Sequence, residues 1–208
     1  MKRIDFWFDP ISPFAYLAFE RLPQALDGCT YAVEYRPVLF AAMLQHWGHK
    51  GPAEIEPKRA WTFRHIAWLA HLHGIALQAP AEHPFNPLAL LRLVVAAGAN
   101  RRAVEAVMRH VWIGGASATD AARMAALTQT LAPARDPSSE AVKAELRANT
   151  EQAIARGVFG VPTFVLEGRL FWGVDALPML RAALAGDAWF EGPAWDEAGS
   201  SRPGIHRA

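Results

Sequence analysis

Two stretches near the N-terminus place apolar residues at every second position, the period of a half-buried β-strand. Residues 4–8 and 31–35 each show this alternation. Between them, apolar residues from Phe14 to Leu22 recur at helical spacing, and Pro13 suits the first helical position. The opening segment is therefore predicted to be β-α-β, a unit whose two strands are usually parallel neighbours.

Between roughly residues 40 and 156 this alternation disappears, and helical stripes of apolar residues take its place. A helix is predicted from Ser139, a candidate N-cap, to Arg156, and Gly157 suits the left-handed position that follows a helix. The clearest other stripes are Trp61, His65, Trp68, Leu69 and Leu72, followed by Val104, Val107, Met108, Val111 and Trp112. This segment is expected to be all-helical.

The strand pattern returns towards the C-terminus. Residues 163–166 and 169–172 flank a Glu-Gly pair, an arrangement typical of a hairpin, and Asp175 opens a final helix. From about Gly186 the chain has loop composition and is expected to pack peripherally or to fray. The complete order is β-α-β, a helical block, then β-β-α.

This order matches a thioredoxin-like fold, an α/β architecture in which a β-α-β half and a β-β-α half share one mixed sheet. The sheet domain is expected to be discontinuous, at residues 1–39 and 157–190. Residues 40–156 would form an all-helical insertion domain, and residues 191–208 a peripheral or flexible tail.

Composition limits the classes of partner that the chain is expected to bind. The formal net charge is +1 over 208 residues, so no strong field attracts nucleic acid or an anionic membrane, and no apolar run approaches the ~20 residues that span a bilayer. The single cysteine, Cys29, cannot form an internal disulfide, and the chain enters its first strand without an apolar export segment. These features favour the cytoplasm, with Cys29 as a small packed residue.

Ser12 lies where the first strand turns into a helix. A thioredoxin-like oxidoreductase would carry Cys-x-x-Cys there, but this chain has Ser12-Pro13-Phe14-Ala15 and cannot exchange disulfides at that position. The Ser12 hydroxyl can still donate a hydrogen bond to an anion at a helix N-terminus, for example a thiolate supplied by a ligand. The alternative is that Ser12 only caps the helix.

Val161-Pro162 begins the first strand of the hairpin, where proline removes a ladder N–H. A cis peptide bond there would turn the backbone of Val161 towards Ser12 and leave its N–H and C=O free to pair with an extended peptide such as glutathione. The alternative is a turn proline that merely limits the strand.

Several polar residues have both a structural and a functional explanation. Asp175 can cap its helix or hold the α-ammonium of a γ-glutamyl group, and Lys58 can be a solvated lysine or contact a carboxylate ligand. His65 lies in an apolar stripe and is expected to be a hydrogen-bonded core histidine. Five further histidines do not show a convincing metal-ligand pattern, so no metal is predicted. They are His46, His49, His71, His73 and His83.

Four motifs together resemble the 2-hydroxychromene-2-carboxylate isomerases, relatives of kappa-class glutathione transferases and DsbA-like proteins. They are Ile4-Asp5-Phe6-Trp7-Phe8-Asp9, Ser12-Pro13-Phe14-Ala15-Tyr16-Leu17, Gly157-Val158-Phe159-Gly160-Val161-Pro162-Thr163-Phe164 and Leu170-Phe171-Trp172-Gly173-Val174-Asp175. The resemblance extends through Pro37-Val38-Leu39, Gly51-Pro52, Pro57-Lys58-Arg59 and Asn86, and so covers roughly residues 3 to 185.

The resemblance implies a role for each matching residue. Ser12 would hold the glutathione sulfur as the catalytic residue. The implied glutathione contacts are Val161, Pro162, Val174, Asp175, Lys58 and His49, the last standing where the family usually has asparagine. The implied substrate pocket contains Phe14, Trp61, Asn86 and Trp112, although packing also explains both tryptophans and helix capping also explains Asn86.

The resemblance also implies an activity. In these isomerases the glutathione thiolate adds to 2-hydroxychromene-2-carboxylate and permits ring opening and bond rotation. The thiolate then departs, which releases trans-o-hydroxybenzylidenepyruvate. The reaction is a step of aromatic catabolism. Two alternatives stay open: a kappa-like transferase that conjugates glutathione to an electrophile, and a non-catalytic thioredoxin-like module that binds a peptide. Because relatives are commonly dimers, the resemblance implies a homodimer that takes a small aromatic carboxylate.

Overall fold

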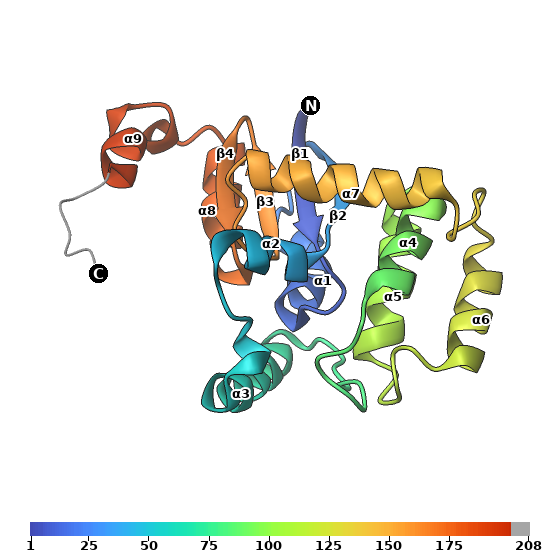
Figure 1. Cartoon of the computed structure of the whole chain (residues 1–208). Helices are drawn as coiled ribbons and strands as arrows, with labels where there is room; N and C mark the ends of the chain where they lie inside the picture. The colour runs from blue at the N-terminus through green and yellow to red at the C-terminus, as the bar shows by residue number, and fades with distance from the viewer. Residues whose placement is uncertain (201–208) are drawn as a thin grey trace.

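One mixed sheet of four strands organises the molecule, which is a computed structural model that describes residues 1–200 (Figure 1). In the order β2-β1-β3-β4, β1 is parallel to β2 and antiparallel to β3, so that Phe6 lies opposite Tyr35 and Phe164. The strands are β1 (Lys2–Phe8), β2 (Tyr31–Pro37), β3 (Thr163–Leu166) and β4 (Arg169–Trp172). The predicted β-α-β unit and the C-terminal hairpin are both confirmed.

The two faces of the sheet pack against different helices. Alternate residues of β1 from Ile4 to Phe8 enter the main core, which they share with α1 (Pro13–Ala25) and α8 (Leu177–Leu184). Trp7 points to the opposite face and belongs to a smaller buried cluster with Val158 of the segment that leads into β3. The alternation that predicted the strand thus supplies both cores.

A run of helices separates β2 from β3, and within the described residues no strand interrupts it. The N-cap predicted at Ser139 is confirmed, because its side chain accepts a hydrogen bond from the N–H of Val142. Gly157 has φ +78°, the left-handed conformation expected after this helix. The helices are α2 (Phe40–Trp47), α3 (Glu56–His73), α4 (Leu88–Ala96), α5 (Arg101–Trp112), α6 (Ala121–Leu131) and α7 (Glu140–Ala155), with a 3-10 turn η1 (Pro52–Glu54) before α3.

The two apolar stripes of this helical block differ in how far they are buried. The stripe of α5, from Val104 to Trp112, is completely buried. In α3 only Ile66 and Ala70 are fully buried. Leu69 of its stripe is half-buried against the main core, whereas the exposed members of the stripe are Trp61 (64%), Trp68 and Leu72. The packing explanation for Trp61 and the core position expected for His65, which is half-buried, are therefore wrong.

The segment beyond α8 is more ordered than its loop composition predicts. It forms a 3-10 turn, η3 (Ala188–Phe190), and a short helix, α9 (Pro193–Gly199), at the periphery of the molecule (Figure 1). The ring of Trp195 lies 5.8 Å from that of Phe171, which anchors α9 to the hairpin. Residues 201–208 of the predicted tail lie outside the described residues. Across residues 1–200, no helix combines the length and apolar character needed to cross a membrane.

Candidate functional site

Ser12 stands at the N-terminus of α1, as predicted. Its backbone is extended, its Oγ accepts a hydrogen bond from the N–H of Ala15 at 3.3 Å, and Pro13 occupies the first helical position. The side chain is nearly buried. An anion brought beside this hydroxyl would meet the positive end of the helix dipole.

The segment before β3 brings a second backbone group to Ser12. The peptide bond between Val161 and Pro162 is cis, which confirms that prediction. The Ser12 hydroxyl donates to the carbonyl oxygen of Val161 at 3.3 Å, although 149 residues separate them. The carbonyl is therefore not free as expected, but a bond of this length is weak and easily exchanged for a ligand.

The loop between β1 and α1 is held from several sides. The buried ring of Trp112 donates from Nε1 to the carbonyl oxygen of Pro10 at 2.9 Å, and the Nε2 of His83 hydrogen-bonds the carbonyl oxygen of Ile11 at 2.9 Å. Because a carbonyl can only accept, His83 donates this proton and is the Nε2-H tautomer. Burial lowers the pKa of His83, which favours the neutral form of the ring. These contacts fix the approach to Ser12.

Asp9 is a central residue of this loop that the sequence analysis did not single out. It is completely buried and accepts hydrogen bonds from the N–H of Ile11 and the N–H of Phe40, both at 3.0 Å. The carboxyl thus ties the Ser12 loop to the first residue of α2. Burial raises its pKa from 3.8 to about 7, against the lowering effect of both hydrogen bonds. The only sequence signal was an acid directly after an apolar strand.

Aromatic rings lead outwards from Ser12 to α3. Phe14 is half-buried and meets the ring of His65 edge-on, with centroids 5.6 Å apart. Trp61 in turn stacks on His65 at 6.1 Å. Phe14 and Trp61 therefore belong to one continuous surface. Trp112 instead lies buried beneath the loop between β1 and α1, as expected if its role is packing.

Three further predicted site residues lie on exposed segments around α3 and α4. His49 directly follows Gly48, the left-handed C-cap of α2, and Lys58 is in the first turn of α3. Asn86 accepts a hydrogen bond from the N–H of Leu88 at 3.0 Å, which realises its capping alternative at the start of α4. Within residues 1–200, none of the three is hydrogen-bonded to Ser12 or Val161.

Asp175 lies in a 3-10 turn, η2 (Val174–Ala176), between β4 and α8. Neither η2 nor α8 has a side-chain cap, so the capping explanation for Asp175 is wrong. Its carboxylate is exposed and folds back over Gly173, so that Oδ1 occupies the place that a Cβ at residue 173 would need. Val174, in contrast, is buried in the main core, so only its backbone could contact a ligand.

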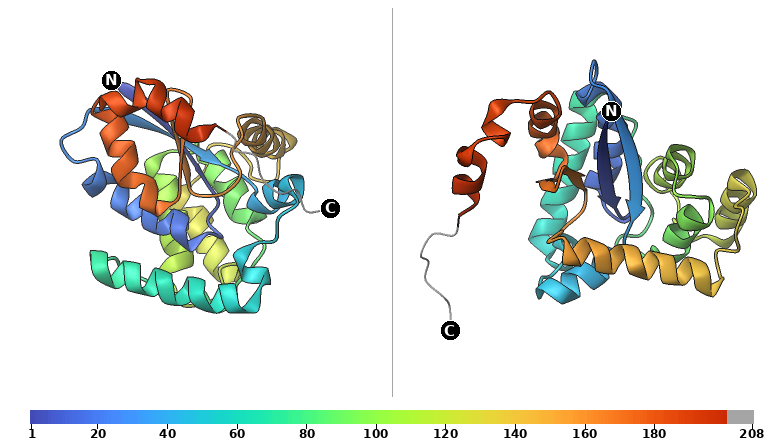
Figure 2. Two further views of the ribbon diagram at one scale, coloured as in Figure 1. Left: turned by 90° about the vertical axis from the view of Figure 1, so that its left-hand side faces the viewer. Right: turned by 90° about the horizontal axis from the view of Figure 1, so that it is seen from above.

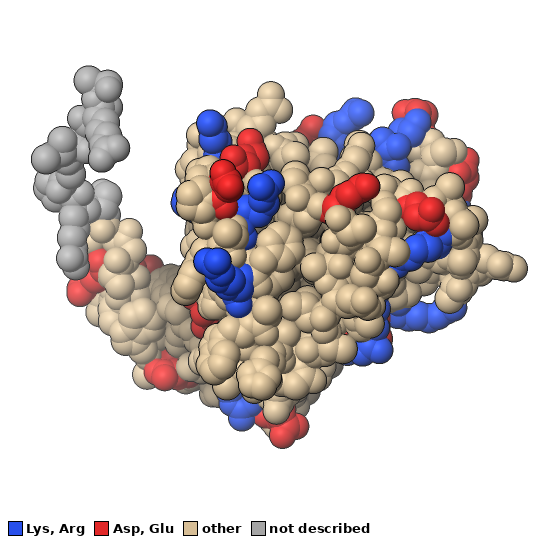
Figure 3. All heavy atoms as spheres, turned by 90° about the horizontal axis from the view of Figure 1, so that it is seen from below, with Lys and Arg blue, Asp and Glu red and all other residues tan. Residues whose placement is uncertain are grey.

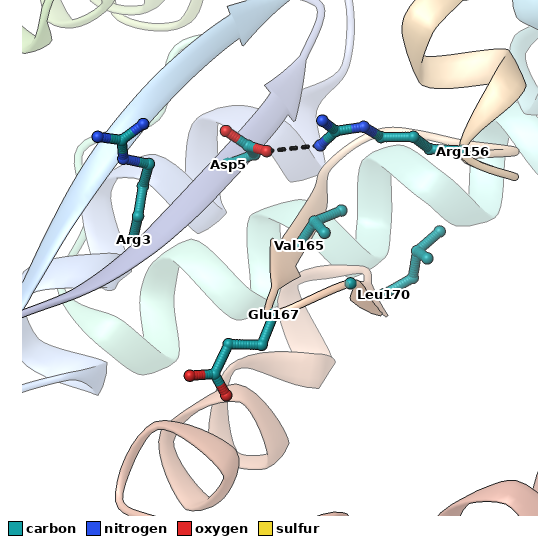
Figure 4. Close-up of a pocket in the computed structure, with 7 residues that line it drawn as sticks. Arg3, Asp5, Arg156, Val165, Glu167 and Leu170 are labelled. Atoms are coloured by element: carbon teal, nitrogen blue, oxygen red, sulfur yellow. Dashed lines mark hydrogen bonds and ion pairs between the residues drawn. The ribbon is translucent and has the colours of Figure 1, made fainter.

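Other parts of the molecule offer less for chemistry. Cys29 is a half-buried residue packed against the main core, and residues 1–200 contain no cluster of three His, Cys, Asp or Glu side chains able to hold a metal. A hollow of about 440 Å³ is lined by residues of β1, β3, the β3–β4 turn and β4, together with Arg156 (Figure 4). The carboxylate of Asp5 there is already paired with Arg156 at 2.8 Å. None of the predicted site residues lines this hollow.

Comparisons with known proteins agree with this arrangement. The family model described as a DSBA-like thioredoxin domain matches residues 3–185. A 2-hydroxychromene-2-carboxylate isomerase from Pseudomonas putida is 30% identical over 87% of this chain and 93% of its own. Glutathione S-transferase kappa 1 from Rattus norvegicus is 27% identical over 89% of this chain and 92% of its own.

A solved structure extends the likeness to three dimensions. The structure of a selenomethionine 2-hydroxychromene-2-carboxylate isomerase has a TM-score of 0.79 and 27% identity, and the match covers 96% of this chain and all of that one. Both the sheet halves and the helical insertion are therefore shared. With its serine at the α1 N-terminus and its cis-proline loop in place, the chain belongs to the DsbA-like thioredoxin family and, within it, to the 2-hydroxychromene-2-carboxylate isomerase family.

Proposed function

We propose that this protein binds glutathione beside Ser12 and uses it to interconvert 2-hydroxychromene-2-carboxylate and trans-o-hydroxybenzylidenepyruvate. One observation carries the proposal. The Ser12 hydroxyl lies at a helix N-terminus and faces the Val161 carbonyl, in a fold whose usual cysteine pair is absent. Such a site favours a thiolate but must receive the sulfur from a ligand.

The donor set suits a tripeptide thiol. The hydroxyl of Ser12 would turn from Val161 to the sulfur, and the backbone of Val161 would then pair with the peptide. The exposed carboxylate of Asp175 is available for an α-ammonium, and the exposed ammonium of Lys58 is available for a carboxylate. Bound glutathione would supply a nucleophile that adds to the substrate and later departs.

The residues around Ser12 would prepare that nucleophile. The N-terminus of α1 and the Ser12 hydroxyl would stabilise negative charge on the sulfur. With a pKa near 7, the buried Asp9 carboxyl carries only part of a negative charge at neutral pH, which limits its repulsion of a thiolate. Phe14, His65 and Trp61 would offer an aromatic surface to the substrate ring. A cytoplasmic setting, which the lone half-buried Cys29 favours, keeps thiols reduced.

A kappa-like transferase is the second candidate, because the rat kappa-class enzyme matches nearly the whole chain. The two reactions differ in their use of thiol. Conjugation consumes one glutathione for each product, whereas isomerisation leaves the free thiol concentration unchanged. Incubation with the chromene carboxylate, followed by thiol titration and product absorbance, separates them.

The first test is calorimetric titration of the protein with reduced glutathione. We expect binding in the micromolar to millimolar range that is weakened about fivefold or more in Asp175→Ala, since one charge-assisted contact is lost. Asp196→Ala, an exposed acid on α9, is the matched control and should bind as the wild type does. No heat at millimolar glutathione would refute the proposal and favour a peptide-binding module.

A further inference from the structure

A groove of about 380 Å³ lies where α7 packs against α2 and α4. Figure 2 shows α7 (gold) passing close to both α2 (blue) and α4 (green). The volume of the groove is within the range of small-molecule sites, roughly 300–1,000 Å³. None of the residues assigned to the candidate site lines the groove, so a ligand bound there would be a separate ligand.

The apolar part of the groove is aliphatic. It consists of Leu39, Ala42, Leu88, Leu146 and Ile154, and no aromatic ring from residues 1–200 lines the groove. Leu146 belongs to a small buried cluster, and Leu39 and Leu88 pack against that cluster while staying half-exposed. An apolar group in the groove would remove their remaining surface from water, which is favourable. The lining therefore favours an alkyl chain over a stacked aromatic ring.

Three cationic side chains border this apolar surface: Arg92 on α4, and Lys143 and Arg147 on α7. Lys143 is already paired with Glu140 at 2.7 Å. Across the described part of the chain, neither arginine has a hydrogen-bonded partner or an ion pair, and the Nε of Arg92 is shielded from water. A buried donor without an acceptor is rare in folded proteins and indicates a place for a missing acceptor.

The cations of the groove act on the same short stretch of α7. The hydrogen bond from Lys143 lowers the pKa of Glu140, and the charges of Arg147 and Arg92 add to this lowering. The formal net charge of the chain is only +1, and the face seen in Figure 3 mixes acidic and basic side chains. The excess of cations is therefore a local property of the groove, and a polyanion would lack the broad basic surface that it needs.

Aliphatic side chains next to unpaired guanidinium groups match one class of ligand. We propose that the groove binds an aliphatic carboxylate, whose carboxylate group is held by Arg92 and Arg147. The alkyl chain would lie along Leu88 and Leu146. A planar guanidinium donates two parallel hydrogen bonds to a carboxylate, so this ligand supplies the acceptor that Arg92 lacks. A cationic or neutral ligand would leave both arginines unpaired.

The groove lies beside the candidate site without being part of it. The N–H of Leu39 donates to the Oγ1 of Thr150 at 3.0 Å, and both residues line the groove. The next residue, Phe40, donates its N–H to Asp9 in the Ser12 loop. One backbone step thus separates the two places. The inference does not depend on what the candidate site binds, and reduced glutathione should not displace the carboxylate.

Titration of the ¹⁵N-labelled protein with decanoate, followed by amide chemical shifts, tests the proposal. We expect shifts on α4 and α7, around Leu88 and Leu146, that saturate with a dissociation constant of about 0.1–5 mM, the range for a ligand of this size. Decylammonium, which has no anionic group, and acetate, which has no alkyl chain, should each bind at least about tenfold more weakly. Equal binding of decanoate and decylammonium would overturn the proposal.

Variants of the groove separate its charged part from its apolar part. Arg92→Gln and Arg147→Gln should each raise the dissociation constant for decanoate at least about threefold, and the double variant at least about tenfold, because charge-assisted hydrogen bonds are lost. Ala42→Phe fills the apolar part and should also weaken binding. Arg64→Gln, at an exposed arginine on α3, is the matched control and should bind normally. No saturable shifts by about 10 mM decanoate, shifts confined to other elements, or unchanged binding in the double variant would overturn the proposal.

Discussion

Helices α5 and α3 both carry apolar residues at helical spacing in the sequence, yet the fold buries them to very different degrees. α5 buries its stripe completely, and its last residue, Trp112, supports the carbonyl of Pro10 under the Ser12 loop. α3 exposes Trp61, Trp68 and Leu72. It packs on the rest of the protein through the buried Ile66 and Ala70 and the partly buried Phe63 and Leu69. α5 therefore supports the loop of the candidate site from the protein interior, and α3 lies beside the site at the protein surface.

The difference shows that an apolar stripe in a sequence does not by itself indicate which surface covers it, or whether the rest of the chain covers it at all. The α5 stripe is satisfied within the chain. The exposed residues of the α3 stripe are not covered by any part of the chain that the structure describes. Substitutions in α5 and the loop above it should therefore act on folding and catalysis, and substitutions on the outer face of α3 should leave the stability of the chain nearly unchanged.

The largest effect is expected at Trp112. Trp112→Ala removes a wholly buried ring and its hydrogen bond to Pro10, so the free energy of unfolding should fall by about 3–5 kcal/mol. Urea denaturation followed by far-UV circular dichroism measures the change. Trp112→Phe keeps most of the ring volume and should lose less. Equal stability of Trp112→Ala and the wild type would contradict the role given to α5.

Asp9, which lies in the loop that α5 supports, should make stability depend on pH. Its folded-state pKa of about 7 exceeds the ordinary value of 3.8, so between these values the folded protein holds a proton that the unfolded chain has released. The contribution of Asp9 to the free energy of unfolding is therefore greatest below pH 4, and it is lost as pH rises through 7. Between pH 5 and 8 the loss should be about 3 kcal/mol.

The control for this pH dependence is Asp9→Asn, which cannot ionise and keeps one carbonyl acceptor for the two backbone N–H groups. Urea midpoints at pH 5 and pH 8 are compared in both proteins, because titration of His83 and His110 then cancels in the difference. The variant should show the flatter dependence. Identical slopes would mean that Asp9 does not hold its proton in the folded protein.

Local features of the chain were predictable because nearby residues decide them. The alternation in β1, the Ser139 cap and the hairpin turn each depend on a few neighbours, and all are confirmed. The cis bond at Val161 was predictable from a proline at the start of a strand. These features, with the element order, were enough for the fold and for the contact between Ser12 and Val161.

What the sequence could not supply depends on contacts between distant segments. Asp9 looks like a turn residue before Pro10, and only its bond to Phe40, 31 residues away, identifies it as part of the site. The direction of the α3 stripe is set by how α3 rests on α1, which periodicity alone does not encode. The exposed positions of His49 and Lys58 likewise follow from the course of the segment between α2 and α3.

Ser12 should affect catalysis more than folding. Loss of a charge-assisted hydrogen bond of about 1.5–3 kcal/mol should reduce isomerase turnover in Ser12→Ala at least about tenfold. Because Ser12 also caps α1, the comparison variant is Ser12→Gly, which keeps most of the capping energy but lacks the hydroxyl. Similar turnover losses in both variants would assign the effect to the hydroxyl, and wild-type turnover in either would remove that role.

The smallest effect is expected on the outer face of α3. Trp68→Ala should change the free energy of unfolding by no more than about 0.5 kcal/mol, because the ring is largely exposed. Ile66→Ala, two residues away but fully buried, should cost about 2–5 kcal/mol under the same conditions. Equal losses in the two variants would mean that the outer face of α3 is packed as tightly as its inner face, and the contrast between α3 and α5 would disappear.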